Sequence, residues 1–528
     1  MRGNRFAWLV NGLQDAISRY RALNDGSRVP VWVGWVLILT AIVYSTLVFV
    51  LSFGGEFGAV ALPSVILAPV FFWLLSYAAR IPSGADSPVE RQVSPWIVSA
   101  LVFVLYLPLV WWNMRTAPDM VGQWEQATGR APLHDWHPVM HTCLMGLAAL
   151  VAKTVRGVAL VQAGVFAFLL GRLYAAFGKY GYCRWASAAV VVAAAANPLG
   201  MWLFCLLLKD SAFALAGLAV TICLIHVVET RGDWLSGWRI WVLSICLMLT
   251  AFLRHNGFFY TVPLILLLPL AVARRNVRKA LLCMASTAAF CGGYLVVRGE
   301  LTRQGTIQPR RYYQGFAESV GLPMCLMAEC YMSNPAKTPD DVKEFLSSFG
   351  DRAFWEASYK GDFNSVKFRL KDPQIKICAV GKRRFFDMLW RTVKANPRAA
   401  RKAFLHVTAL AWAPFPDSAR SCSFTPVKPR RHPLLKSLNW YREMMVRAPW
   451  GTLVTVPGSY LLLVVLAFCY GVMRKGIRVC VLALPLIGYQ FGTMLLLTGM
   501  DYRFFFITVL CGAAASLSML SGSGRDAQ

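Results

Sequence analysis

The stretch WASAAVVVAAAANPLGMWLFCLLLKDSAFALAGLAVTICLIHVVE, residues 185–229, decides the fold class of this chain. It is apolar almost throughout, and as one α-helix its roughly 44 residues would be ~66 Å long. The hydrocarbon core of a bilayer is only ~30 Å thick. The stretch therefore predicts two consecutive membrane spans, at 185–207 and 211–229, with the charged pair Lys209-Asp210 at the tip between them.

A second break is possible within the same stretch. Asn197-Pro198-Leu199-Gly200 could end the first helix, and Lys209-Asp210 would then lie within a span. Charged side chains inside a bilayer cost roughly 2.5–3.5 kcal/mol on insertion scales, so a pair placed there favours a functional role. At a hairpin tip Lys209 has a plainer explanation, because a lysine can extend its ammonium group to the interface by snorkelling.

Composition extends the membrane prediction to the whole chain. Of 528 residues, 57% are hydrophobic and 15% are charged, and the mean hydropathy is +0.50. Soluble domains carry about 25% charged residues. Apolar runs of about 18 or more residues recur, whereas a β-barrel would show short alternating strands. We therefore expect an all-α integral membrane protein.

About twelve apolar segments have the length of a transmembrane helix, with ends uncertain by a few residues. They lie at 31–53, 58–80, 94–113, 157–178, 185–207, 211–229, 238–254, 257–273, 279–297, 451–473, 479–499 and 503–520. A further apolar segment, 137–152, is short and begins with a His-Pro step. We interpret it as a re-entrant or juxtamembrane helix in the outer leaflet.

The net charge of +28 is explained by membrane topology. Cytoplasmic loops collect Lys and Arg, and the basic loops 274–279 and 474–478 face the cytoplasm if the N-terminus is inside. A full span at 137–152 would turn both loops outward. We expect a multi-pass protein of the cell membrane with a cytoplasmic N-terminal segment, 1–30, without a signal peptide, and a cytoplasmic tail, 521–528. Nucleic acid is not an expected partner.

The long loop 298–448 falls on the outer side in this topology. Its Pro, Gly and Asp turn signals, with helix-like stretches at 340–349 and 383–415, predict a small extracytoplasmic domain. Four of the fourteen cysteines lie outside the spans, which permits two disulfides in three alternative pairings. These four are Cys325, Cys330, Cys378 and Cys422. The chain shows no zinc-binding cysteine spacing, and its cysteine pattern does not support an electron carrier.

The outer loop 114–136 carries the first candidate catalytic residue, Asp119. Its carboxylate could accept a proton from a sugar hydroxyl or hold a divalent cation beside a phosphate. A solvated loop acid or a helix N-cap is the alternative interpretation. Gln123, four residues later, is a candidate for substrate binding.

Histidines follow at the end of this loop. His137 and His141 are four residues apart, so they are expected to share a helix face, and with Asp135 they could bind zinc. A simpler interpretation makes Asp135 or His137 the cap of a helix with Pro138 in its first turn. We favour contact between these histidines and a phosphate or hydroxyl group of a substrate.

Three further polar steps separate apolar spans on the same outer face. They are Lys209-Asp210, Arg254-His255-Asn256 before Gly257, and Asp501-Tyr502-Arg503. A stop signal at the second step and an internal ion pair at the third are the alternative interpretations. Taken together, the three steps and Asp119 gather carboxylates and cations where an anionic lipid presents its phosphate. The chain has no Walker motif, which argues against a nucleotide-driven pump.

The order of these motifs resembles the GT-C superfamily of membrane glycosyltransferases, in a bacterial branch. The resemblance rests on an acid after an early span, followed by WHP at 136–138, LKDS at 208–211, RHNG at 254–257 and DYRF at 501–504. Better-known relatives are the protein O-mannosyltransferases and aminoarabinose transferases. The resemblance covers about 94–297 and 451–520, within a transmembrane core at 31–297 and C-terminal transmembrane helices at 451–520.

The resemblance implies transfer of a sugar from a polyprenyl-phosphate donor to a glycan, lipid or protein acceptor on the outer face, in cell-envelope glycan assembly or modification. It matches Asp119 to the essential acid of the first outer loop and Asp210 to a second acid. The implied substrate-binding residues are Gln123, His137, His141, Lys209, Arg254, His255, Asn256, Tyr502 and Arg503. His137-Pro138-Val139 is one proline short of the family pattern, and Met120 stands where many members have a paired acid. A divalent cation is the one possible cofactor.

Two other classes of protein use similar features. A transporter, or a flippase for lipid-linked glycans, also places charges within membrane helices. Transporters usually bind their substrate near the midplane of the membrane and often contain internal repeats. In this sequence the polar steps cluster on one face, and no repeat is visible. A scaffold whose basic outer domain binds an acidic cell-wall polymer is the third class, and it would not depend on Asp119.

Overall fold

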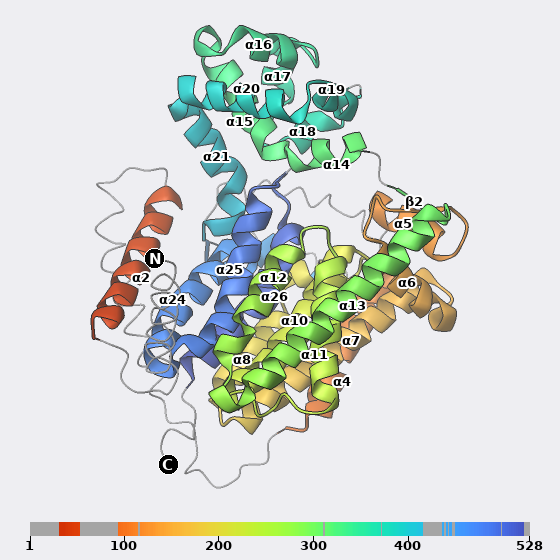
Figure 1. Ribbon diagram of the computed structural model, residues 1–528, viewed down its shortest axis with the longest axis vertical. Helices are drawn as coiled ribbons and strands as arrows, with labels where there is room; N and C mark the ends of the chain where they lie inside the picture. Colours follow the sequence, from red (N-terminus) through yellow and green to blue (C-terminus); the bar gives the residue numbers. More distant parts are fainter. Residues whose placement is uncertain are drawn as a thin grey trace, which may run out of the picture.

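A computed structural model describes residues 31–52, 93–113, 117–309, 312–370, 372–414, 436–437, 440–441, 443–445, 449–497 and 499–521. Figure 1 shows a bundle of long helices with a group of shorter helices stacked on one of its ends. The predicted span 58–80 and the terminal segments 1–30 and 522–528 lie outside the described residues.

The bundle is formed by helices from both halves of the chain. Its elements are α2 (Val31–Ser52), α4 (Pro95–Asn113), α5 (Pro118–Ala127), α6 (Val139–Ala152), α7 (Val155–Lys179), α8 (Arg184–Ala195), α9 (Pro198–Phe204), α10 (Lys209–Glu229), α11 (Trp238–Phe252), α12 (Phe258–Leu267), η1 (Leu268–Ala271), η2 (Arg274–Asn276), α13 (Val277–Arg303), α23 (Pro449–Thr455), α24 (Pro457–Lys475), η5 (Ile477–Val479), α25 (Cys480–Met494), η6 (Tyr502–Phe505) and α26 (Phe506–Leu520).

Among the described residues, seven helices are long and apolar enough to cross a membrane, or eight if the bent pair α8 and α9 forms one span. This confirms the prediction of an all-α membrane protein. Helix α10 lies near the centre and is buried along most of its length, whereas only 22% of the apolar window in α4 and in α13 is buried. The predicted re-entrant segment forms α6, which has 14 residues and is too short to span by itself.

Both predicted breaks in the stretch 185–229 are present. Asn197 caps α9 by accepting hydrogen bonds from the backbone N–H groups of Leu199 and Gly200 at 3.1 and 3.0 Å, and Pro198 occupies the first turn. These are ordinary helix-start signals. The chain bends by 52° between α8 and α9, and α10 begins at Lys209. The charged pair therefore lies in the first turn of a span.

The shorter helices form a second unit between α13 and α23. They are α14 (Tyr312–Ser319), α15 (Gly321–Ser333), η3 (Pro335–Lys337), α16 (Asp340–Ser347), α17 (Arg352–Ser358), α18 (Asn364–Lys367), α19 (Pro373–Ala379), α20 (Lys382–Ala395) and α21 (Pro397–Trp412). The helix predicted at 340–349 is present as α16. The stretch predicted at 383–415 is two helices, because Pro397 cannot continue α20.

The four cysteines outside the spans permit two disulfides, but none is formed among the three that the structure describes. These three are Cys325, Cys330 and Cys378, and Cys422 lies outside the described residues. Cys325 and Cys330 are buried five residues apart on α15, so their Cα atoms are roughly 8 Å apart, beyond the reach of a disulfide.

The helical unit is anchored to the bundle through apolar packing. Its core includes Trp355 and Phe385 and continues into Leu461 of α24 and Leu497 after α25. A two-residue parallel pairing of β1 (Leu133–His134) with β2 (Ile307–Gln308) also ties the loop before α6 to the segment after α13. The end of the bundle under this unit is therefore held in place from two sides.

The closest approach in this junction predicts a sensitive position. A Cβ atom on Gly458 of α24 would lie 2.4 Å from the carbonyl oxygen of Ala413, at the end of α21. Because the colliding atoms belong to the backbone, Gly458→Ala should destabilise the protein by about 1–3 kcal/mol. Thermal unfolding of the purified protein in detergent measures this loss. Gly292→Ala on α13, where nothing lies within 4 Å of an added Cβ, is the control, and equal melting temperatures would contradict the prediction.

Candidate functional site

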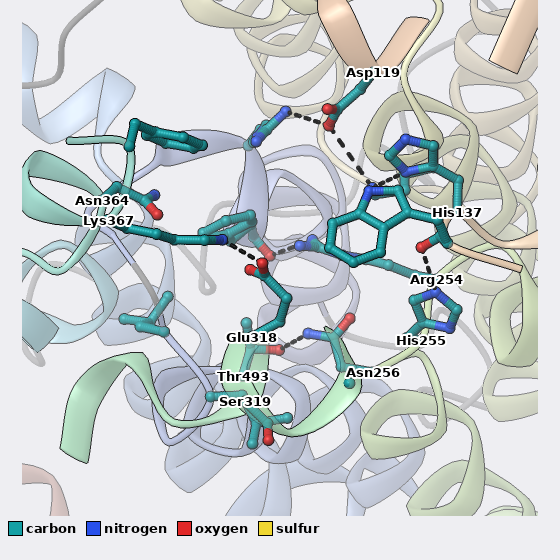
Figure 2. Close-up of a pocket in the computed structure, with 18 residues that line it drawn as sticks. Asp119, His137, Arg254, His255, Asn256, Glu318, Ser319, Asn364, Lys367 and Thr493 are labelled. Carbon is teal, nitrogen blue, oxygen red and sulfur yellow. Dashed lines mark hydrogen bonds and ion pairs between the residues drawn. The ribbon is translucent and has the colours of Figure 1, made fainter. Parts of the chain in front are cut away.

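A cavity of about 350 Å³ lies where the bundle meets the helical unit. Figure 2 shows that its walls come from segments far apart in the chain. Of the eleven residues that the sequence singles out, seven line this cavity: Asp119, His137, Lys209, Arg254, His255, Asn256 and Arg503. The other four, Gln123, His141, Asp210 and Tyr502, are buried next to it and do not line it.

Asp119 lies in the first turn of α5, behind Pro118, and its side chain is 35% exposed. The N-cap of α5 is Ala117, so the interpretation of Asp119 as an N-cap is wrong. A carboxylate in a first turn is still favoured by the helix dipole. Its Oδ2 lies 3.5 Å from Nη1 of Arg503 and 3.9 Å from Nζ of Lys209. Asp119 is thus held between two cations on the cavity wall.

Lys209 also contacts the loop that precedes α6. Its ammonium group donates a hydrogen bond of 3.0 Å to Nδ1 of His137. Burial, and then the positive charge of Lys209, lower the pKa of His137 to about 3. His137 is therefore neutral near neutral pH and presents a lone pair to the lysine.

The predicted arrangement of the two histidines is wrong in one respect. His137 precedes α6, whose N-cap is Pro138, so His137 and His141 do not share a helix face and neither Asp135 nor His137 is the cap. Asp135 forms an ion pair with Arg298 of α13 instead. Among the described residues no group of three His, Cys, Asp or Glu side chains is placed to hold a metal ion.

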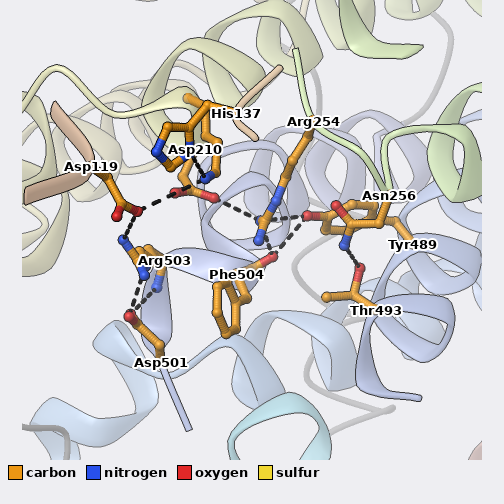
Figure 3. A network of polar contacts seen from close by, with 11 residues as sticks. Asp119, His137, Asp210, Arg254, Asn256, Tyr489, Thr493, Asp501, Arg503 and Phe504 are labelled. Atoms are coloured by element: carbon orange, nitrogen blue, oxygen red, sulfur yellow. Dashed lines mark hydrogen bonds and ion pairs between the residues drawn. The ribbon is translucent and has the colours of Figure 1, made fainter. Parts of the chain in front are cut away.

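Beneath the cavity wall, Asp210 and Arg254 form a buried ion pair at 3.0 Å (Figure 3). Their side chains are 0% and 8% exposed. Arg254 also donates to the hydroxyl of Tyr489 at 2.8 Å and to the carbonyl of Phe504 at 2.9 Å. The Asp210 oxygens receive no hydrogen bond from the described residues, so the charge of Arg254 is their main compensation.

The turn between α11 and α12 also brings His255 and Asn256 to the cavity. A Cβ on Gly257 would lie 2.0 Å from the carbonyl oxygen of Thr250, so this turn requires glycine. His255 Nε2 lies 3.2 Å from the carbonyl of Trp136. Asn256 donates to the hydroxyl of Thr493 at 2.7 Å. The turn is thereby fixed against both the loop before α6 and the end of α25.

The last polar step contributes Arg503. Its Nε lies 2.8 Å from Oδ2 of Asp501, so the predicted internal ion pair is present, and its Nη1 faces Asp119 as well. Tyr502 points elsewhere, with its buried hydroxyl donating to Oδ1 of Asn197 at 3.4 Å. Only the charged member of this step therefore faces the cavity.

Gln123 and His141 lie in the layer behind Asp119. Gln123 donates to the hydroxyl of Thr142 at 3.2 Å. Its Oε1 and Nδ1 of His141 are buried and accept no hydrogen bond from the described residues. These two polar atoms are buried, and the residues that carry them do not line the cavity.

Eleven of the eighteen residues that line the cavity are not among those predicted from the sequence. Trp136, Thr493 and Phe504 line it from the bundle, and Glu318, Asn364 and Lys367 line it from the helical unit. Trp136 and Phe504 are next in sequence to the predicted residues His137 and Arg503. This adjacency could have identified them as lining residues. Glu318 and Lys367 lie 49 residues apart in the long loop, and no pattern links them.

The chain matches no protein-family model, and neither a curated protein nor a solved structure matches it.

The buried ion pair predicts a large stability effect. Arg254→Met should destabilise the protein by about 3–5 kcal/mol, because the Asp210 charge is left buried without a partner. Thermal unfolding in detergent would report it. The double variant Asp210→Asn with Arg254→Met should recover part of the loss. If the loss of stability in the double variant equals the sum of the losses in the two single variants, Asp210 and Arg254 are not coupled.

The state of His137 predicts a dependence on pH. Its folded pKa of about 3 lies below its ordinary value of 6.5, so between these values the unfolded chain binds a proton that the folded chain does not. Stability should therefore fall as the pH drops below about 6.5. Melting temperatures at about pH 7.5 and 4.5 should differ more in the wild type than in His137→Gln. The same difference in both proteins would show that His137 contributes nothing to it.

Proposed function

We propose that this protein is a membrane glycosyltransferase of the GT-C type, which transfers a sugar from a polyprenyl-phosphate donor to an acceptor on the outer face. In this proposal the chain crosses the membrane twelve times, with α11 and the α12–η1 segment counted as spans, and the unit α14–α21 is extracytoplasmic. The basic turn at Arg274–Asn276 then faces the cytoplasm, in agreement with the positive-inside rule.

One observation carries the proposal: Asp119 lies between Lys209 and Arg503 on the wall of one cavity at the end of the bundle. Lys209 begins a membrane span, so its ammonium group is at the level where a membrane lipid presents its phosphate. A polyprenyl phosphate could bring its phosphate to these cations while its chain stays in the bilayer. The cavity has room for one sugar beyond that phosphate.

The chemistry follows from these positions. The donor phosphate draws Lys209 and Arg503 and releases the Asp119 carboxylate toward the acceptor hydroxyl. The acceptor oxygen bonds to the anomeric carbon as the bond from that carbon to the phosphate oxygen breaks. The electron pair leaves with polyprenyl phosphate, whose charge the two cations stabilise, and the acceptor proton passes to Asp119. Direct displacement inverts the anomeric centre.

The first test is the Asp119→Asn variant. Membranes that contain the protein should convert labelled polyprenyl-phosphate sugars, with a native membrane extract as acceptor, into polyprenyl phosphate and a new glycoside. Asp119→Asn should reduce this turnover by about 10²–10⁴-fold, the usual contribution of a general base. Chromatography of the labelled products measures it.

Glu125→Gln is the matched control, because Glu125 is a second acid on α5 that pairs with Arg130 at 3.2 Å and does not line the cavity. It should leave turnover unchanged. Full activity of Asp119→Asn would refute the role of Asp119. Movement of a labelled lipid-linked sugar across vesicles without any bond cleavage would favour the transporter or flippase.

A further inference from the structure

The cavity has a second wall that comes from the helical unit. Glu318 and Ser319 at the end of α14, and Asn364 and Lys367 on α18, face the cations of the bundle across the cavity. Figure 2 shows Asp119 on one side, with Glu318, Lys367 and Asn364 on the other. The two walls differ in origin, because the first lies at the ends of membrane helices and the second does not.

The centre of the second wall is an ion pair. Lys367 donates to Glu318, and their side chains are 8% and 21% exposed. Burying a charged pair gains little stability over an apolar pair of the same shape. Its position on a cavity wall therefore favours a role in binding, where the lysine holds the Glu318 carboxylate in one orientation.

Polar and aromatic groups surround this pair. Asn364 offers one amide donor group and one acceptor, and Phe368 lies at the rim with 80% of its surface exposed. The Lys367 ammonium group is 5.4 Å from the centre of the Phe368 ring. A carboxylate and an amide bind hydroxyl groups, and an exposed ring packs against the apolar face of a flat ligand.

The second wall is fixed relative to the first. The Nδ2 atom of Asn364 lies only 2.4 Å from where a Cβ on Gly499 would be. Gly499 lies in the connection between α25 and η6, shortly before Asp501 and Arg503, so α18 rests directly on the segment that supplies one of the cavity cations. Packing of Trp412 and Leu497 in one apolar core holds the same junction from within.

We propose that this wall, formed by Glu318, Asn364, Lys367 and Phe368, binds the acceptor, and that the acceptor is an uncharged sugar unit with free hydroxyl groups. The inference rests on the proposed transfer from a polyprenyl phosphate. In a direct displacement the acceptor attacks from the side opposite the leaving phosphate. The cations of the bundle take the phosphate, so the acceptor lies against the opposite wall and extends its attacking hydroxyl into the cavity, where the released Asp119 carboxylate accepts its proton. The Glu318 carboxylate repels an anionic acceptor and accepts hydrogen bonds from hydroxyl groups.

The experiment separates acceptor binding from donor binding. Turnover is measured with the labelled polyprenyl-phosphate sugar that the wild type uses, over a dilution series of the native membrane extract as acceptor and separately over donor concentration. Glu318→Gln should raise the apparent acceptor KM about tenfold, the loss of one charge-assisted hydrogen bond. The donor KM should stay within about twofold.

Two variants make the result secure. Phe368→Ala changes an exposed side chain, so it should fold normally and should raise the acceptor KM severalfold. Glu329→Gln is the matched control, because Glu329 pairs with Lys402 at 3.1 Å in the same helical unit and lines a different cavity. It should change neither constant.

The outcomes separate the two proposals. A wild type that uses no donor removes the proposed transferase and this inference together. A wild type that transfers sugar, with Glu318→Gln and Phe368→Ala unchanged in acceptor KM, overturns the inference alone. A rise in donor KM alone also overturns it, because Glu318 would then contact the donor sugar.

Discussion

The ion pair between Asp210 and Arg254 is the interaction on which the rest of the site depends. It joins the first turn of α10 to the turn before α12, and Arg254 extends the connection to Tyr489 of α25 and to the backbone of Phe504. Both charges are almost fully removed from solvent, so neither can lose its partner without a large cost. Residues of α10, the α11–α12 turn, α25 and η6 are thereby held together at one point.

The difference in burial gives the three cations different roles. Arg254 is engaged by Asp210, Tyr489 and Phe504, so its guanidinium is committed to the structure although its edge lines the cavity. Lys209 and Arg503 are more exposed, at 19% and 26%, and their distances of 3.9 and 3.5 Å to Asp119 are long for ion pairs. They are the two cations that the proposed transfer assigns to the donor phosphate. The sequence alone treated all three as equivalent.

The sequence predicts those features that depend on local pattern. Apolar periodicity and length place the helices, and Asn197-Pro198 predicts the bend. Charged steps between spans predict that Asp119, Lys209, Arg254 and Arg503 meet, because a bilayer leaves them one level at which to lie. Local pattern does not distinguish the lining residue Arg503 from its buried neighbour Tyr502. It also misplaced His137 on a helix, since the start of α6 depends on Pro138 and the contacts of the preceding loop.

The pairing of Glu318 with Lys367 could not be predicted from the sequence, because it depends on how α14 packs against α18. Such pairing is set by the core around Trp355 and Phe385, whose residues carry no functional pattern. The site thus combines two kinds of residue with different physical constraints. Cations at helix ends lie at one end of the bundle, where, in the proposed transfer, a donor lipid reaches them by diffusion in the plane of the membrane. Groups on the helical unit are placed by packing, and in the proposed transfer they form the part of the site that selects the acceptor.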